Sequence, residues 1–172
     1  MNIRPLVCAL ALLIAGSATG LANGAARAIS KSTRHLTFTA SLAPDIVTSG
    51  TKMSVAVDVR PKKGVHVYAP GTQYRAVAIA IEPNRALAVD EVVYPRPVSY
   101  LFTPLNETVL VYDRPFRLTL GMTVAGTPAQ LVALTAESRL SITGQLTYQA
   151  CDAAVCYLPV SVPLEWRVTI AH

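Results

Sequence analysis

The sequence lacks the clusters of basic residues and histidines that mark several common functions. Of its 172 residues, 15 are Lys or Arg and only three are His. The basic residues are scattered, and the densest group, residues 60–63, is interrupted by Pro61. A nucleic-acid surface needs a basic stripe with aromatic partners, so the pattern argues against nucleic-acid binding. His35, His66 and His172 lie far apart in the sequence, so a metal site that joins them to two thiolates is the weaker alternative. We expect no metal and no cofactor.

The sequence also lacks an apolar run long enough to cross a membrane as a helix, which needs about 20 residues. The longest such run, residues 5–15, follows a short positive start that ends at Arg4 and precedes small residues up to Ala26. This order is typical of a secretory signal peptide. We predict a cleaved signal peptide at residues 1–26, export, and no stable membrane insertion of the mature chain, residues 27–172. An uncleaved anchor is the alternative.

Residues 27–172 contain no internal repeat, no domain linker and no long helical period. Apolar and polar residues alternate instead in residues 36–40 and 53–59, and this period of two turns one face of a strand inward. Proline and glycine separate further short segments of the same kind. These segments are residues 65–69, 76–81, 89–94, 108–112, 116–124, 130–136, 140–148 and 162–170. Short strands at such regular spacing predict a single all-β domain, a β-sandwich.

One segment, residues 95–106, is rich in proline and is predicted as a long connection. Three prolines exclude it from the middle of a sheet. Long connections in compact domains often form lids or binding loops. Tyr100 and Phe102 in this segment are therefore candidates for covering a site, and the alternative is that they close the end of the sandwich.

The chemically active feature of the predicted mature chain is its pair of cysteines, Cys151 and Cys156, separated by four residues. If those four residues form a hairpin loop, the cysteines face each other at a Cα separation of about 4.5–5.5 Å, which a disulfide accepts. The bond closes a loop of about six residues, for which chain entropy gives only about 2 kcal/mol. Such a short loop is a poor staple and is common in exchanging disulfides. A redox pair and a structural disulfide both remain open at this point.

The segment YQACDAAVCYLP, residues 148–159, resembles the signature of the N-terminal periplasmic domain of the thiol:disulfide interchange protein DsbD. The segment GVHVYAPG, residues 64–71, is similar to that family's early strand, and residues 94–120 are similar to its middle. The resemblance extends over residues 36–170. It implies an immunoglobulin-like β-sandwich in the periplasm that acts as a thiol–disulfide oxidoreductase. It implies a thioredoxin-like periplasmic or membrane-tethered partner.

The resemblance also implies roles for single residues. Cys156 would form the mixed disulfide with a partner and Cys151 would resolve it. Phe102, or less favourably Tyr100, would be the aromatic cap over the pair, and His66 and Tyr68 would flank it.

Three features depart from the family. The cysteines are one residue closer than in its best-known members, no acidic residue lies within residues 99–103, and His66 occupies a position where an aromatic side chain is common. The sequence reaches His172 without an electron channel, so we expect a stand-alone exported protein that a separate partner reduces. The alternative function is an exported immunoglobulin-like binding domain with a structural disulfide.

Overall fold

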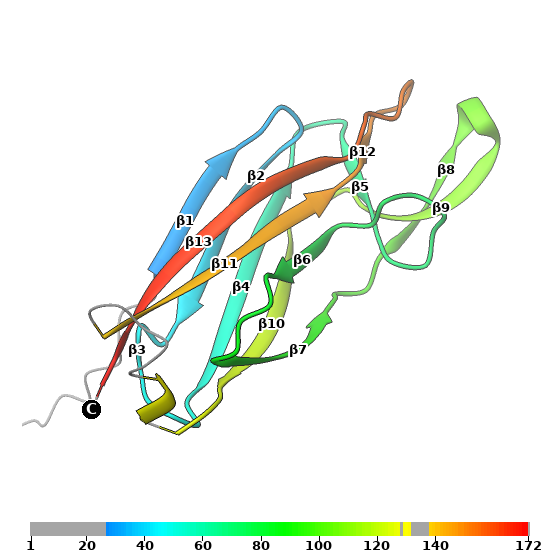
Figure 1. Cartoon of the computed structure of the whole chain (residues 1–172). Helices are drawn as coiled ribbons and strands as arrows, with labels where there is room; N and C mark the ends of the chain where they lie inside the picture. The colour runs from blue at the N-terminus through cyan, green and yellow to red at the C-terminus, as the bar shows by residue number, and fades with distance from the viewer. Residues whose placement is uncertain (1–26, 128, 132–137, 172) are drawn as a thin grey trace, which may run out of the picture.

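The computed structural model describes residues 27–127, 129–131 and 138–171 of the chain. The predicted signal peptide, residues 1–26, lies outside the described residues. Two sheets face each other in layers, and a third, smaller sheet continues from one end of them (Figure 1). The first sheet has the order β1 (Arg27–Ser32), β2 (Leu36–Ala43), β4 (Lys52–Pro61), β10 (Phe116–Val124), β7 (Leu87–Val93). The second has the order β3 (Ile46–Val47), β13 (Val160–Ile170), β11 (Arg139–Tyr148), β6 (Ala78–Ile81).

The alternation seen in the sequence builds the core between the two layers. In β2, Leu36, Phe38 and Ala40 are buried while Thr37 faces solvent, and β4 repeats the pattern beside it in antiparallel register. β11 and β13 contribute the opposite wall of the same apolar cluster, with Trp166 among its members. The prediction of an all-β sandwich is confirmed, and the fold is immunoglobulin-like.

The third sheet carries the cysteines. Its order is β12 (Ala150–Cys151), β5 (His66–Tyr68), β9 (Glu107–Tyr112), β8 (Val98–Phe102). β12 follows β11 after a single residue, so the chain passes directly from the second sheet into the third. The cysteine pair is thereby held at one end of the sandwich.

The prediction of a long connection at residues 95–106 is wrong. Val98–Phe102 forms β8, which pairs with β9, and Thr103–Leu105 forms the short 3-10 helix η1 between them. The three prolines lie at positions 95, 97 and 104, outside the strand, so they remove no hydrogen-bond donor from it. β8 is also an edge strand of its sheet, as the proline argument required.

The prediction of a strand at residues 130–136 is also wrong where the structure describes it. Gln130 and Leu131 are helical, and residues 132–136 lie outside the described residues. Thr127 and Gln130 form a capping box: the Thr127 amide donates to the Gln130 side chain at 2.8 Å, and the Gln130 amide donates to the Thr127 hydroxyl at 3.3 Å. The Thr-Pro-Ala-Gln sequence is typical of a helix start, but the apolar residues that follow it favoured the prediction of a strand.

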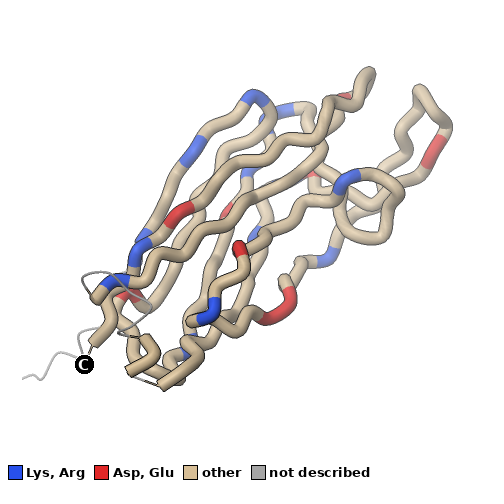
Figure 2. Tube along the Cα trace, viewed as in Figure 1, with Lys and Arg blue, Asp and Glu red and all other residues tan. Residues whose placement is uncertain are grey.

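Lys and Arg residues are spread along several strands rather than gathered in one stripe (Figure 2). Within the part of the chain that the structure describes, no helix has the length and apolar character needed to cross a membrane.

Candidate functional site: the Cys151–Cys156 disulfide

Cys151 and Cys156 face each other across a tight turn and form a disulfide. Cys151 ends β12, and Cys156 opposes it in an isolated antiparallel bridge with the two Cα atoms 4.0 Å apart. The Asp152 amide donates to the Val155 carbonyl at 3.0 Å and closes the turn. The four-residue spacing therefore produces the opposed pair that the sequence predicts.

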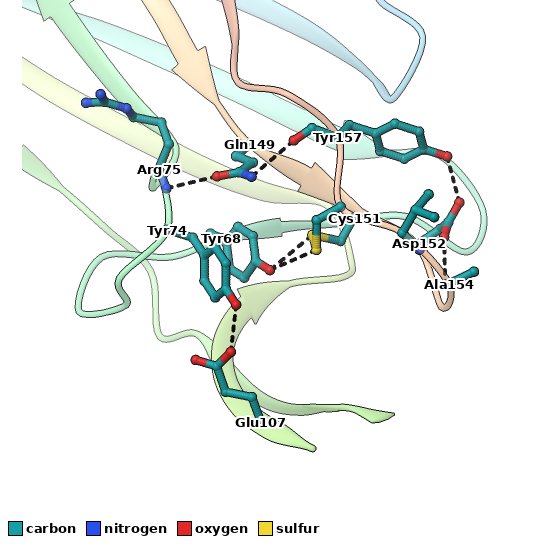
Figure 3. The surroundings of a disulfide bond; sticks show 11 residues. Tyr68, Tyr74, Arg75, Glu107, Gln149, Cys151, Asp152, Ala154 and Tyr157 are labelled. Carbon is teal, nitrogen blue, oxygen red and sulfur yellow. Dashed lines mark hydrogen bonds between the residues drawn. A yellow bond between two sulfur atoms is a disulfide. The ribbon is translucent and has the colours of Figure 1, made fainter. Parts of the chain in front are cut away.

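The Asp152 carboxylate holds this turn in shape (Figure 3). It accepts the Tyr157 hydroxyl at 2.6 Å and the amides of Ala154 and Val155 at 2.8 and 2.9 Å. The bond from Tyr157, with those from the amides, lowers the pKa of Asp152 to about 2. Gln149 fixes the outgoing strand by donating to the Tyr157 carbonyl at 3.1 Å. The loop between the cysteines is thus ordered by its own side chains.

The two cysteines differ in their exposure. Cys151 is fully buried in a small cluster with Tyr68, Val109 and Val111, while Cys156 is half-buried and packs against that cluster from outside. A thiolate that approaches from solvent therefore meets the Cys156 sulfur first.

The Tyr68 hydroxyl lies against both sulfurs, 3.1 Å from Cys151 and 3.2 Å from Cys156 (Figure 3). A disulfide sulfur carries no hydrogen, so the hydroxyl is the donor and its one hydrogen is shared between the two sulfurs. Tyr68 is fully buried, and desolvation raises its pKa to about 12. The hydroxyl therefore stays protonated and can donate to either sulfur when the bond opens.

Tyr74 and Glu107 support Tyr68 from the side away from the sulfurs. The Tyr74 ring stacks on the Tyr68 ring at a centroid distance of 4.2 Å, and its hydroxyl donates to Glu107 at 2.6 Å. Gln73 donates to the other Glu107 oxygen at 2.9 Å. No local period joins position 74 to position 107, so these residues cannot be predicted from the sequence, and only the fold brings them together.

His66 on β5 and Tyr100 on β8 pack beside the buried cysteine. His66 is buried and opposes Cys151 in the pairing of β5 with β12, and its ring lies 4.2 Å from the Tyr100 ring, centroid to centroid. Burial lowers the pKa of His66. Tyr100 packs against the cluster that contains Cys151.

Phe102 lies two residues farther along the same face of β8 and is buried opposite Glu107. It is not a member of the apolar cluster that holds Cys151, whereas Tyr100 contacts that cluster. The structure thus brings His66, Tyr68 and Tyr100 to the cysteines and places Phe102 two residues beyond Tyr100 on β8. Which ring caps the pair stays a prediction.

No group of three His, Cys, Asp or Glu side chains that could hold a metal ion occurs among the described residues. The His35 ring stacks on Tyr157 at 4.4 Å, and of the two described histidines only His66 opposes a cysteine in the sheet. The chemistry that the arrangement supports is exchange at the sulfurs themselves.

Comparison with known proteins gives a family and a fold. The family described as thiol:disulfide interchange protein DsbD, N-terminal, matches residues 33–163, more than half of the chain. The N-terminal periplasmic domain of ScsB from Proteus mirabilis is similar at 13% identity and a TM-score of 0.49, over 80% of this chain and 47% of that one. The chain thus spans about half the length of that structure.

The N-terminal domain of Neisseria meningitidis DsbD in its reduced form is similar at 19% identity and a TM-score of 0.44. That similarity covers 77% of this chain and 86% of the other. No curated protein sequence matches the chain.

Proposed function

The chain belongs to the family of the N-terminal domain of the thiol:disulfide interchange protein DsbD, and we propose that it relays electrons between thioredoxin-like partners through Cys151 and Cys156. The observation that carries the proposal is the unequal burial of the two cysteines. A purely structural disulfide needs no such difference. An exchanging disulfide needs one cysteine that a partner thiolate can reach and one that is shielded from solvent.

The relay begins when a thiolate of a reduced partner attacks the sulfur of Cys156, the less buried of the two cysteines. The Cys151–Cys156 bond breaks, a bond between Cys156 and the partner forms, and Cys151 leaves as a thiolate that the Tyr68 hydroxyl can stabilise. The second thiol of the partner then attacks its own sulfur in the mixed disulfide and releases Cys156. Two electrons have entered this domain, and the same steps in reverse pass them to the next partner.

Exposed apolar side chains near the pair support docking of a protein partner. Val155 lies in the turn between the cysteines and Leu158 follows Cys156, and they are 49% and 85% exposed. Apolar side chains in solvent beside a reactive disulfide fit a surface that a partner covers while electrons are transferred.

Periplasmic export is part of the proposal and rests on the family together with the order of charge, apolar run and small residues in residues 1–26. The mature protein is expected to begin at Arg27 or within a few residues of it. Mass spectrometry of protein recovered from the periplasm tests this, and an intact Met1 on such protein contradicts it.

The roles of the two cysteines are tested by trapping. Cys151→Ser removes the residue that resolves the linkage, so a mixed disulfide through Cys156 should accumulate with a thioredoxin-like protein on non-reducing electrophoresis. Cys156→Ser is the matched control and should trap little, because Cys151 is fully buried. Equal trapping by both variants contradicts the assignment of roles.

The alternative, a binding domain with a structural disulfide, predicts a different equilibrium. A structural bond should have a potential below about −300 mV, and an exchanging bond should lie above it. A reduction potential below that value, together with no trapping by either serine variant, would contradict the relay and favour a binding domain with a structural disulfide.

A further inference from the structure

His66 carries a buried nitrogen that the structure leaves without a partner. Its side chain is only 3% exposed, and its Nε2 atom has no hydrogen-bond partner among the described residues. A buried polar atom left unpaired costs about 1–3 kcal/mol, and native proteins keep few of them. A nitrogen that must be free at one step of a reaction is one reason to keep it.

The sheet places this imidazole on the same side as the buried sulfur. His66 and Cys151 are directly opposed partners in the antiparallel pairing of β5 with β12, so their side chains share one face. Tyr68, two residues along, lies on that face too and reaches the sulfurs. The neighbouring pair, Val67 and Ala150, points instead into the main core.

The proposed relay requires a base at this point. When Cys151 attacks the mixed disulfide, its thiol must lose a proton, and the thiol is fully buried. Burial disfavours a free thiolate and raises the pKa of a thiol. Burial raises the pKa of Tyr68 to about 12. At neutral pH its hydroxyl is therefore protonated, so it donates a hydrogen bond to sulfur but accepts no proton.

The groups around His66 leave it neutral. Tyr68 lies beside it on β5, Tyr100 contacts its ring from β8, and the carboxylates of Asp113 and Asp152 act on it from the loop after β9 and the cysteine turn. Burial lowers the pKa of the imidazole more than the two carboxylates raise it. At pH 7 the ring is therefore in the form that accepts a proton.

We propose that His66 accepts the proton of the Cys151 thiol when Cys151 attacks the mixed disulfide between Cys156 and a partner. The Cys151–Cys156 bond forms, the Cys156–partner bond breaks, the electron pair leaves with the partner as its thiolate, and the imidazole becomes imidazolium. In the opposite direction the imidazolium returns the proton to the Cys151 thiolate. The proposal rests on the relay above and adds the group that makes the buried cysteine reactive.

The two chemical steps can be separated with Ellman's reagent, an aromatic disulfide that releases one coloured thiolate per step. The reduced protein reacts first through Cys156 and releases one equivalent of thiolate. Cys151 then resolves the mixed disulfide and releases a second equivalent. Stopped-flow absorbance resolves the two phases, and Cys151→Ser, which should lose only the second phase, identifies them.

His66→Phe keeps an aromatic ring against Tyr100 and removes the nitrogen. We expect the second phase to slow about 100-fold at pH 7, the size of effect that positioned general bases give, with the first phase unchanged. The wild-type second phase should slow as pH falls through the pKa of His66, and the variant should lose this dependence. His35→Phe is the matched control: His35 is also buried and stacked on a tyrosine, and its ring nitrogens have no hydrogen-bond partner among the described residues, but it does not oppose Cys151 in the sheet. It should leave both phases unchanged.

An unchanged second phase in His66→Phe overturns the proposal, and so does an equal slowing at every pH, which indicates a packing role only. If the variant does not fold, NMR titration of His66 in the reduced wild-type protein decides. The pKa of the ring must match the pH midpoint of the second phase, and a mismatch overturns the proposal. A protein that shows no first phase overturns the relay itself, whereas a normal first phase with a second phase indifferent to His66 overturns this inference alone.

Discussion

The Tyr68 hydroxyl offers the sharpest test of how the disulfide opens. Its single hydrogen is shared between sulfurs at 3.1 and 3.2 Å, and the Tyr68→Phe change removes it without altering the ring. A hydrogen bond to a neutral group contributes about 1 kcal/mol, and one to a charged group contributes about 1.5–3 kcal/mol. The bond therefore strengthens by about 0.5–2 kcal/mol as the Cys151 sulfur becomes a thiolate.

That difference predicts a rate. About 0.5–2 kcal/mol corresponds to a slowing of about 2- to 30-fold in the attack of a thiolate on the disulfide. Because burial raises the pKa of Tyr68 to about 12, the hydroxyl stays protonated, so the slowing should be the same at pH 6 and pH 9. The assay is the reduction of the oxidised protein by dithiothreitol, quenched with acid and counted by thiol alkylation in mass spectrometry.

Tyr148→Phe is the matched control for this prediction. Tyr148 is equally buried, but its hydroxyl bonds Thr33 at 2.8 Å rather than a sulfur. The control should lose about 1 kcal/mol of unfolding free energy and keep the wild-type reduction rate. If Tyr68→Phe is reduced as fast as the wild type, or if the control slows equally, the hydroxyl does not stabilise the leaving thiolate.

Three further predictions concern stability. Replacing both Cys151 and Cys156 by alanine should leave a cooperatively folded protein that has lost about 2 kcal/mol in urea unfolding, since the bond closes a loop of about six residues; an unfolded variant would favour the structural disulfide. Phe102→Ala should cost about 3–5 kcal/mol because the ring is buried, whereas Leu101→Ala beside it, which is 55% exposed, should cost far less; a small loss at Phe102 would mark it as a lid. The pKa of Asp152 is lowered to about 2, so its support of the cysteine turn should be complete above pH 4 and lost as pH falls through 2; hydrogen exchange of the two amides it binds measures this, and protection that persists at pH 1.5 contradicts it.

Alternation of apolar and polar residues is enough to predict the layers of the fold. Alternation at positions such as Leu36, Phe38 and Ala40 is a local signal, because a strand turns successive side chains to opposite faces whatever it pairs with. The four-residue spacing of Cys151 and Cys156 is local in the same sense, since a tight turn brings its two ends together. The sequence predictions are wrong where two local signals compete. Prolines on both sides of Val98–Phe102 predicted a loop where a strand forms, and apolar residues after Thr127 predicted a strand where a capping box begins a helical turn.

The surroundings of the two sulfurs depend instead on how the strands pair in the folded protein. Cys151 meets Tyr68 across 83 positions of the sequence, and Tyr74 meets Glu107 across 33. Nothing in the spacing of these residues encodes the contacts, because they depend on which strands pair and in which register. The pairing of β5 with β12 sets His66 opposite Cys151, and a register shifted by one residue would turn the imidazole to the other face of the sheet. The cysteine pair can be predicted from the sequence. The Tyr68 hydroxyl, the His66 imidazole and the Tyr100 ring come together around it only once the third sheet has formed.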